Sequence, residues 1–288
     1  MFISARIKDS RSGGFTLTEL LVVIVTLAVL VAVVLPAIAG TKPNSQVFQC
    51  LENQRQIVRG WQMYAEDNGD LLPPNDYPRT MSYAASSTAA QASLKNWVVG
   101  TIEQSADAID LPALEGKLSE LLDPNTLLSE FLTVKAVYHC PADTYMDPNA
   151  GNRVHVRSYS MNSAVGTIGN TYYVSGSPAP GTPVQGGWLN GSTYNAGQTV
   201  WRTYGKITSF NKPGPAKTFI TMEENPYTIN DGSIALSANA WPAQTYLIDF
   251  PAANHEGGAN ISFADGHVTP HKWLDARTYT PEIGRAHV

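Results

Sequence analysis

The feature that most constrains this chain is a long uncharged and strongly apolar stretch near its amino terminus. No residue between Leu20 and Ala39 carries a charge, and leucine, valine, isoleucine and alanine fill almost every position. An α-helix rises about 1.5 Å per residue, so this stretch would extend over roughly 30 Å, the thickness of the hydrocarbon core of a bilayer. The sequence therefore predicts a transmembrane helix over residues 15–40.

The residues in front of this stretch differ from an ordinary secretory signal. The small pair Gly13-Gly14 precedes the apolar block, whereas a signal peptide carries its small-residue cleavage site after the block. Cleavage after Gly14 would therefore retain the helix. Glu19 lies about one turn into the helix, where an unpaired charge costs a few kcal/mol, so it should have a cationic partner. The alternative is an uncleaved signal anchor that keeps Met1, with Glu19 at the headgroup level.

The run Gly13-Gly14-Phe15-Thr16-Leu17-Thr18-Glu19-Leu20 resembles the prepilin processing site of type IV pilins and type II secretion pseudopilins. The resemblance implies that residues 1–14 are a leader, removed between Gly14 and Phe15 by a prepilin peptidase that also methylates the new amino terminus. Glu19 would then pair with the Phe15 ammonium of a neighbouring subunit. The implied partners are other pilin or pseudopilin subunits, an inner-membrane assembly platform and membrane lipid.

A second motif lies near the carboxyl terminus, where His255 is followed by nine residues and then by Asp265-Gly266. It is similar to a processing-associated signature that accompanies the pilin leader in a large group of bacterial proteins. The alternation around Ile261, followed by Asp265-Gly266, predicts a β-hairpin within residues 255–268 with a two-residue type I′ turn. His255 is expected to bond a backbone or acidic group, and Asp265 to accept from turn amides.

Residues 45–66 place apolar side chains at alternating spacings of three and four, which predicts an amphipathic helix that covers a sheet. Pro36 and Pro43 predict a bend before it. With the strand candidates that follow, the resemblance implies an α+β pilin-like fold. One long N-terminal helix, transmembrane in its first half and amphipathic in its second, would pack on an antiparallel β-sheet, and residues 41–288 would form the extracytoplasmic globular domain.

The two cysteines of the chain are Cys50 and Cys140. In an oxidising compartment such a pair often forms a disulfide, and closing so long a loop would stabilise the fold by roughly 4–5 kcal/mol. The alternative is a pair of buried thiols that act as small hydrophobic side chains. The sequence leaves both open.

The charge pattern indicates where the chain works. The net charge is −5 and only 15% of residues are charged, so there is no basic cluster for nucleic acid. Arg6, Lys8 and Arg11 precede the apolar block and favour a cytoplasmic amino terminus. The expected location is the bacterial inner membrane, crossed once, with the C-terminal domain in the periplasm or, after assembly, in a cell-surface filament.

Catalytic motifs are absent from the sequence. It contains no Gly-x-Ser-x-Gly elbow, Walker loop, dinucleotide fingerprint or His-Glu-x-x-His, so an enzyme is not expected. Several side chains are of metal-binding type, but the short ligand spacing of a zinc site is missing. No cofactor is expected, and calcium is a better candidate than zinc because some pseudopilins that resemble this chain bind it. The side chains considered are His255, Asp265, His267, His271, Glu223 and Glu224.

The favoured function is therefore structural. The chain would be a subunit of a type IV pilus-like or type II secretion pseudopilus filament, processed by prepilin peptidase and N-methylated. The alternative is a membrane-tethered surface module that binds a glycan or a protein and does not polymerise. Such a module would use Trp188 and the tyrosines of the Gly- and Ser-rich segment 166–197.

Overall fold

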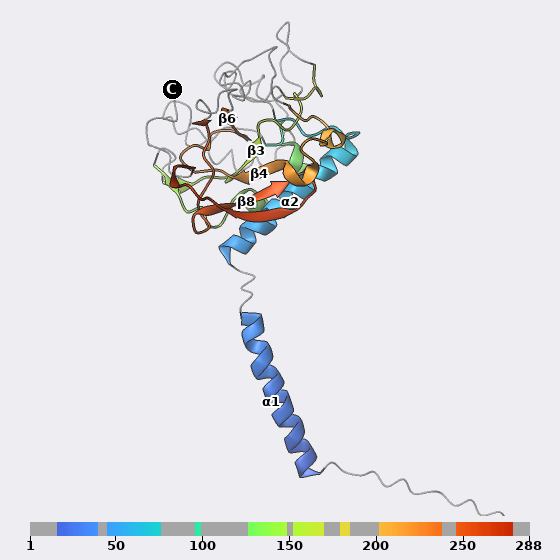
Figure 1. Cartoon of the computed structure of the whole chain (residues 1–288), viewed down its shortest axis with the longest axis vertical. Coiled ribbons are helices and arrows are strands. Elements are labelled where there is room, and N and C mark those ends of the chain that lie inside the picture. Colours follow the sequence, from blue (N-terminus) through green and yellow to red (C-terminus); the bar gives the residue numbers. More distant parts are fainter. Residues whose placement is uncertain are drawn as a thin grey trace, which may run out of the picture. The chain divides into compact units, whose positions relative to one another are not determined.

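The computed structural model describes residues 16–39, 45–75, 96–98, 126–148, 152–169, 179–184, 202–237 and 246–278. The chain divides into two compact units, residues 1–45 and residues 46–288. The first unit contains helix α1 (Leu17–Ala39), and the second, called the head below, contains helix α2 (Gln46–Asp67) and all the strands (Figure 1).

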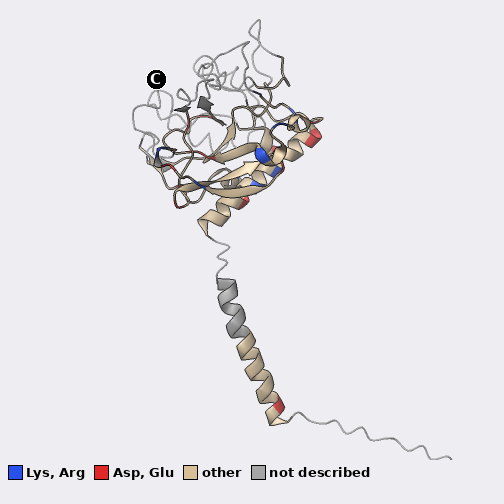
Figure 2. Ribbon diagram, in the orientation of Figure 1, with Lys and Arg blue, Asp and Glu red and all other residues tan. Residues whose placement is uncertain are grey.

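Helix α1 has 23 residues, and its sequence contains no lysine or arginine. It carries an acidic side chain in its first turn (Figure 2). That side chain, Glu19, accepts a hydrogen bond from the backbone N–H of Thr16 at 2.8 Å, so it satisfies one of the free amides at the start of the helix. The Thr26 hydroxyl donates to the carbonyl of Val23 at 2.9 Å, and its polarity is thus satisfied within the helix.

Helix α2 has 22 residues and is amphipathic. One face is buried, and it consists of Cys50, Gln54, Ile57, Val58, Gly60, Trp61 and Ala65. The helix ends at Asp67 because Gly69 adopts a left-handed φ of 63° and the N–H of Asp70 returns to the carbonyl of Ala65 at 2.8 Å. The sequence placed an amphipathic helix at nearly these residues.

The sheet of the head has five strands in the order β5-β3-β4-β8-β9. Neighbouring strands are antiparallel except β5, which runs parallel to β3. Helix α2 packs on this sheet along β8, β9 and β4 (Figure 1). The five strands are β3 (Tyr159–Asn162), β4 (Phe219–Glu223), β5 (Ser233–Ile234), β8 (Gly258–Phe263) and β9 (Val268–Lys272).

Shorter elements complete the described part of the head. Two small antiparallel pairs are β1 (Met146–Asp147) with β2 (Arg153–Val154), and β6 (Leu236–Ser237) with β7 (Tyr246–Leu247). The 3₁₀ helices are η1 (Leu127–Glu130), η2 (Lys135–Tyr138), η3 (Ile207–Ser209), η4 (Pro215–Lys217) and η6 (Ala276–Thr278).

The core of the head lies between α2 and the sheet. Trp61, Ile57, Tyr159 and Ile220 are fully buried there. Gln54 is also fully buried, but its amide is satisfied: it donates to the carbonyl of Asn260 at 2.6 Å and accepts from the Thr221 hydroxyl at 3.3 Å. Buried polar groups that are bonded in this way fix the position of the helix along the strands.

A disulfide joins Cys50 in α2 to Cys140, which follows η2. The two residues are 90 positions apart in the sequence. A bridge that closes a loop of this size stabilises the fold by about 4–5 kcal/mol in the chain-entropy model, mainly by restricting the unfolded chain.

The expected pilin-like fold is wrong in three respects. First, α1 and α2 are two separate helices of moderate length, and α2 packs on the sheet. Gly40 and Pro43, which are both poor helix formers, lie between them in the sequence. Second, none of the helices in the described ranges has the length and apolar character needed to cross a bilayer.

Third, the sheet is mixed rather than antiparallel. The carbonyl of Gly232 accepts from the N–H of Met161 at 2.8 Å, and the carbonyl of Ile234 accepts from the N–H of Ser163 at 3.2 Å. These bonds hold β5 beside β3 in the same direction. Arg157 holds the segment that precedes β5, because its guanidinium donates to the carbonyl of Asp231.

The hairpin of β8 and β9 forms, but its turn is not the two-residue type I′ turn that the sequence suggested. Phe263 pairs with His267, and the N–H of Gly266 donates to the carbonyl of Phe263 at 2.9 Å. The loop therefore has three residues, and only Gly266, with φ of 91°, is left-handed. A type I′ turn needs two left-handed residues, and Asp265 is not one of them.

A test of this packing uses Gly258 at the start of β8. A Cβ atom there would lie 2.2 Å from the carbonyl oxygen of His271 on β9. We expect Gly258→Ala to lower the free energy of unfolding by about 2–3 kcal/mol, because the backbones of the two strands must separate. Gly214→Ala is the matched control, since no atom lies within 4 Å of its added Cβ. Equal unfolding curves in urea for the two variants would contradict the packing of β8 on β9.

Candidate functional site

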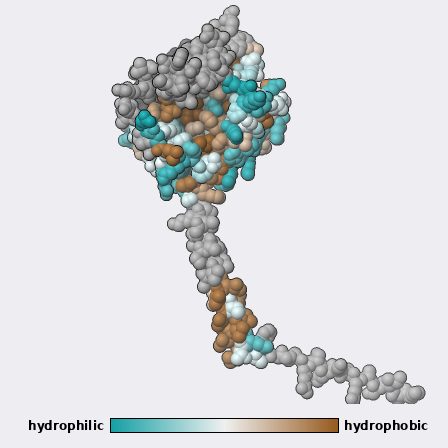
Figure 3. All heavy atoms as spheres, viewed as in Figure 1, coloured by the Kyte–Doolittle hydropathy of each residue, from teal (hydrophilic) through white to brown (hydrophobic). Residues whose placement is uncertain are grey.

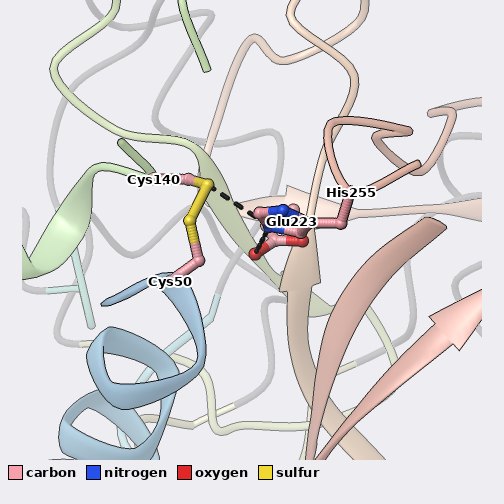
Figure 4. Close-up of side chains that lie close together, drawn as sticks. All are labelled: Cys50, Cys140, Glu223 and His255. Carbon is pink, nitrogen blue, oxygen red and sulfur yellow. Dashed lines mark hydrogen bonds and ion pairs between the residues drawn. A yellow bond between two sulfur atoms is a disulfide. The ribbon is translucent and has the colours of Figure 1, made fainter. Parts of the chain in front are cut away.

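The candidate site is a buried cluster of four side chains that come from distant parts of the chain. Cys50 lies in α2, Cys140 follows η2, Glu223 ends β4, and His255 lies in the turn before β8. One ligand-type atom from each residue lies within 4.8 Å of those of the other three. Figure 4 shows the disulfide beside the imidazole and the carboxylate. These four residues are called the Cys-Glu-His cluster below.

Glu223 lies at the centre of the cluster, and its side chain is fully buried. One carboxylate oxygen accepts from the N–H of Asn260 at 2.6 Å, and the other accepts from the side-chain amide of Asn260 at 3.1 Å. Nε2 of His255 lies 3.1 Å from the second oxygen. Several hydrogen bonds to the carboxylate offset much of the cost of removing it from water.

His255 joins the carboxylate to the disulfide. Its Nε2 lies 3.5 Å from Sγ of Cys140, and its side chain is 5% exposed. The backbone and side-chain N–H groups of Asn260 already donate to both carboxylate oxygens, so we assign the proton of the contact with Glu223 to Nε2. Nδ1 is then the lone-pair nitrogen, and this buried atom has no hydrogen-bond partner among the described residues.

The surroundings of the cluster are polar but ordered. The N–H of Cys140 donates to the hydroxyl of Ser158 at 3.2 Å, and that hydroxyl donates to the carboxylate of Asp143 at 2.7 Å. The hydroxyl of Tyr159 lies 3.4 Å from the carbonyl of Cys50. Burial, with the charge of Glu223 as a second cause, raises the pKa of Tyr159 well above its usual value, so this phenol stays neutral.

The His255 and Asp265-Gly266 signature is divided between the two ends of β8. His255 precedes the strand and contacts an acidic group, Glu223. Asp265 follows the strand and accepts from the N–H of His267 at 3.2 Å. A six-residue strand separates them by roughly 20 Å, so they do not form one site.

The two parts of the signature therefore lie at opposite ends of β8, the strand on which α2 packs. At the second end, the side-chain amide of Gln62 donates to the carbonyl of Ala264 at 3.2 Å. A Cβ at Gly266 would meet that same amide at 3.2 Å, which favours glycine at this position in addition to its left-handed φ.

The remaining residues that the sequence analysis named as candidates lie outside the cluster or outside the described residues. Gly13, Gly14, Phe15 and Trp188 lie outside the described residues. Glu19 lies in the first turn of α1. His271 is exposed on β9, where its ring lies 4.6 Å from that of Trp273 at an interplanar angle of 60°, and it is not part of the cluster.

A second cluster of buried polar side chains in the head surrounds Arg157. No pattern in the sequence predicted this cluster. The guanidinium donates to Ser160 Oγ at 2.9 Å and to the carbonyls of Tyr159 and Asp231. The adjacent Glu224 is fully buried, and neither of its carboxylate oxygens has a hydrogen-bond partner at standard geometry in the described part of the chain. Burial, and next the charge of Asp249, raise the pKa of Glu224 well above its usual value.

Comparison of the chain with protein-family models, with curated proteins and with solved structures finds no match.

Replacing His255 tests the buried hydrogen bond between its imidazole and Glu223. We expect His255→Ala to lower the free energy of unfolding by about 2–3 kcal/mol, because Glu223 would lose a donor inside the protein. His267→Ala is the matched control: it removes the pair with Asp265, whose side chains are 44% and 35% exposed, and should cost less than about 1 kcal/mol. Urea unfolding of the full chain measures both, and a smaller loss for His255→Ala would be inconsistent with the geometry.

Replacing Glu224 gives a pH-dependent prediction. A carboxyl with a raised pKa in the folded state contributes stability fully below its unfolded pKa of about 4, and this stability is lost as the pH rises through the folded value. Glu224→Gln keeps the shape without the charge, so the variant should be more stable than the parent at pH 8 and nearly equal to it at pH 4. Exposed Glu66→Gln is the control. Thermal unfolding between pH 4 and 8 measures the difference, and a gap that shrinks with rising pH would refute the assignment.

Proposed function

We propose that the chain is a structural subunit of a filament of the type IV pilus-like or type II secretion pseudopilus kind, in which the α1 helices of many copies pack together. The observation that carries the proposal is the surface of α1. All the large apolar side chains between Leu17 and Leu30 are exposed, from 45% at Val23 to 80% at Leu17 (Figure 3). A helix that is apolar on every side is normally buried against other apolar surface.

The partner surface of α1 is taken to be α1 of other copies. Successive residues from Leu20 to Val25 point to all sides of the helix, so one contact with a single partner would leave much of the apolar surface in water. A bundle of many copies covers every side. This geometry favours a helical filament over a dimer or a monomeric binding module.

Glu19 is proposed to set the register of the bundle. Hydrogen bonds from the backbone and the side chain of Thr16 lower its pKa, which favours the charged form of the carboxylate in the exposed helix. A charge buried without a partner is strongly unfavourable. Cleavage between Gly14 and Phe15, as the resemblance to prepilins implies, would create a cation four residues before Glu19 that an adjoining copy can present to it.

The head is proposed to work outside the cytoplasm. The Cys50–Cys140 disulfide supports this location, because structural disulfides persist in oxidising compartments and are rare where thiol reductants are abundant. The head would then lie on the outside of the filament.

The proposal is tested by producing the chain in cells with a prepilin peptidase and an assembly platform. Mass spectrometry of the amino terminus should find methylated Phe15 as the first residue, and electron microscopy should find filaments that contain the chain. Comparison of the secreted proteins after deletion of its gene separates the pseudopilus from the surface pilus. A chain that retains Met1 and remains monomeric would exclude the filament.

The role of Glu19 gives a specific prediction. Glu19→Ala should be processed normally but should yield at least about tenfold fewer filaments, because the ammonium of Phe15 loses its partner in the bundle. Glu66→Ala, which removes an exposed carboxylate from α2, should assemble as the parent does. Immunoblots of sheared filaments measure the yield, and a normal yield from Glu19→Ala would reject the pairing.

A further inference from the structure

We propose that the Cys-Glu-His cluster becomes a four-ligand Zn²⁺ site when the Cys50–Cys140 disulfide is reduced. The ligands would be the two cysteine thiolates, Nε2 of His255 and a carboxylate oxygen of Glu223. The site lies wholly within the head, and it is independent of filament assembly.

The spacing of the ligand atoms fits tetrahedral zinc. With bonds of about 2.3 Å to sulfur and about 2.0–2.1 Å to nitrogen and oxygen, a tetrahedral site separates its nitrogen and oxygen by about 3.3 Å and its sulfur and nitrogen by about 3.6 Å. In the head, Nε2 of His255 lies 3.1 Å from Oε1 of Glu223 and 3.5 Å from Sγ of Cys140. Two edges of the tetrahedron are therefore already in place.

The remaining adjustment is the separation of the two sulfurs. In a tetrahedral zinc site they lie about 3.8 Å apart, which a covalent S–S bond forbids. Breaking the bond frees both side chains to move by rotation about their Cα–Cβ bonds. Cys50 lies in α2 and Cys140 in the segment after η2, so the metal would hold together the same two elements that the disulfide joins.

The donor set is one that zinc prefers, and the protein already supports part of it. Two thiolates, an imidazole and a carboxylate match zinc in charge and in softness. The backbone and side chain of Asn260 hold Glu223 by two hydrogen bonds, which is the kind of outer support that orients metal ligands. The turn that carries His255 is partly exposed, so an ion would have to enter by local opening of this turn.

The imidazole must change its tautomer. Nε2 binds the metal only after its proton is lost, and a neutral ring then carries the proton on Nδ1. Nδ1 has no hydrogen-bond partner among the described residues. Missing support of this kind weakens metal sites by about 10–100-fold, so the affinity should be lower than in a site with a complete outer shell.

The chemical steps balance. A dithiol or phosphine reductant supplies two electrons, which break the S–S bond and give two thiols, while the reductant becomes a disulfide or, with water, a phosphine oxide. Binding of Zn²⁺ then releases the two thiol protons. Oxidation by a disulfide reverses the first step and expels the ion, because neutral disulfide sulfurs are poor ligands.

The experiment uses Co²⁺ as a spectroscopic probe for the zinc site in the full chain. After reduction with a phosphine, we expect one Co²⁺ per chain, with a thiolate-to-cobalt charge-transfer band, intense visible bands of tetrahedral cobalt, and displacement of both by Zn²⁺. The oxidised chain should show none of these bands. Their absence from the reduced chain, or their presence in the oxidised chain, would overturn the site.

Variants separate the ligands from bystanders. His255→Gln should weaken Co²⁺ binding by at least about tenfold and shift the visible bands, because one nitrogen ligand is lost. His267→Gln changes an exposed histidine of the same hairpin and should bind as the parent does. Equal binding by His255→Gln and the parent would show a two-thiolate site without this imidazole and would overturn the assignment.

Thermal unfolding keeps the test decisive if reduction loosens the head. Zn²⁺ should raise the Tm of the reduced chain, or refold it if reduction alone unfolds it, because binding free energy adds to folding free energy. The oxidised chain should gain nothing. A reduced chain whose circular dichroism and Tm are unchanged by Zn²⁺ would contradict the proposal.

Discussion

The burial of one face of α2 against the sheet is the constraint on which the rest of the head depends. Its apolar part comes from Ile57, Val58 and Trp61, and apolar burial alone would let the helix slide along the strands. Gln54 removes this freedom, since its buried amide is bonded to Asn260 on β8 and to Thr221 on β4. The disulfide at Cys50 fixes the start of the same helix. Apolar burial holds α2 against the sheet, and the polar and covalent contacts determine where along the strands it lies.

Asn260 links this packing to the buried carboxylate. Its carbonyl accepts from Gln54, while its N–H and side-chain amide donate to Glu223. One residue of β8 therefore serves both α2 and the Cys-Glu-His cluster, so the position of the helix and the orientation of the carboxylate depend on the same strand. A buried charge is expensive without such donors, and its geometry is correspondingly rigid. The imidazole of His255 lies between this carboxylate and Sγ of Cys140, at 3.1 Å and 3.5 Å.

Short residue patterns predicted the local elements of the head. The spacing of Ile57, Trp61 and Ala65 was enough to place α2, and the β8–β9 hairpin followed from alternation and a glycine. The turn was misjudged because two residues can suggest a type I′ turn, while the register that selects the three-residue loop depends on the pairing of Phe263 with His267. The prediction of one long N-terminal helix, which came from the family resemblance, was wrong, because the described residues form two separate α-helices, α1 and α2. The parallel β5 depends on the remote Arg157, which no local pattern reveals. The cluster was equally inaccessible, because positions 50, 140, 223 and 255 meet only in the folded head.

The exposed apolar helix α1 and the Cys-Glu-His cluster lie in different units of the chain, so the two can be considered separately. Glu223 and His255 lie in the head and α1 in the other unit, so the proposed assembly through α1 would not involve these two side chains. A buried histidine–carboxylate pair is weak grounds for stability, since apolar side chains of similar volume often serve as well. The disulfide joins α2 to the segment after η2, and the His255–Glu223 hydrogen bond separately joins the turn before β8 to β4. A metal held by all four side chains would join all four of these elements to one another. Exchange between the two states would therefore change how many parts of the head are fastened together, while leaving α2 attached in both.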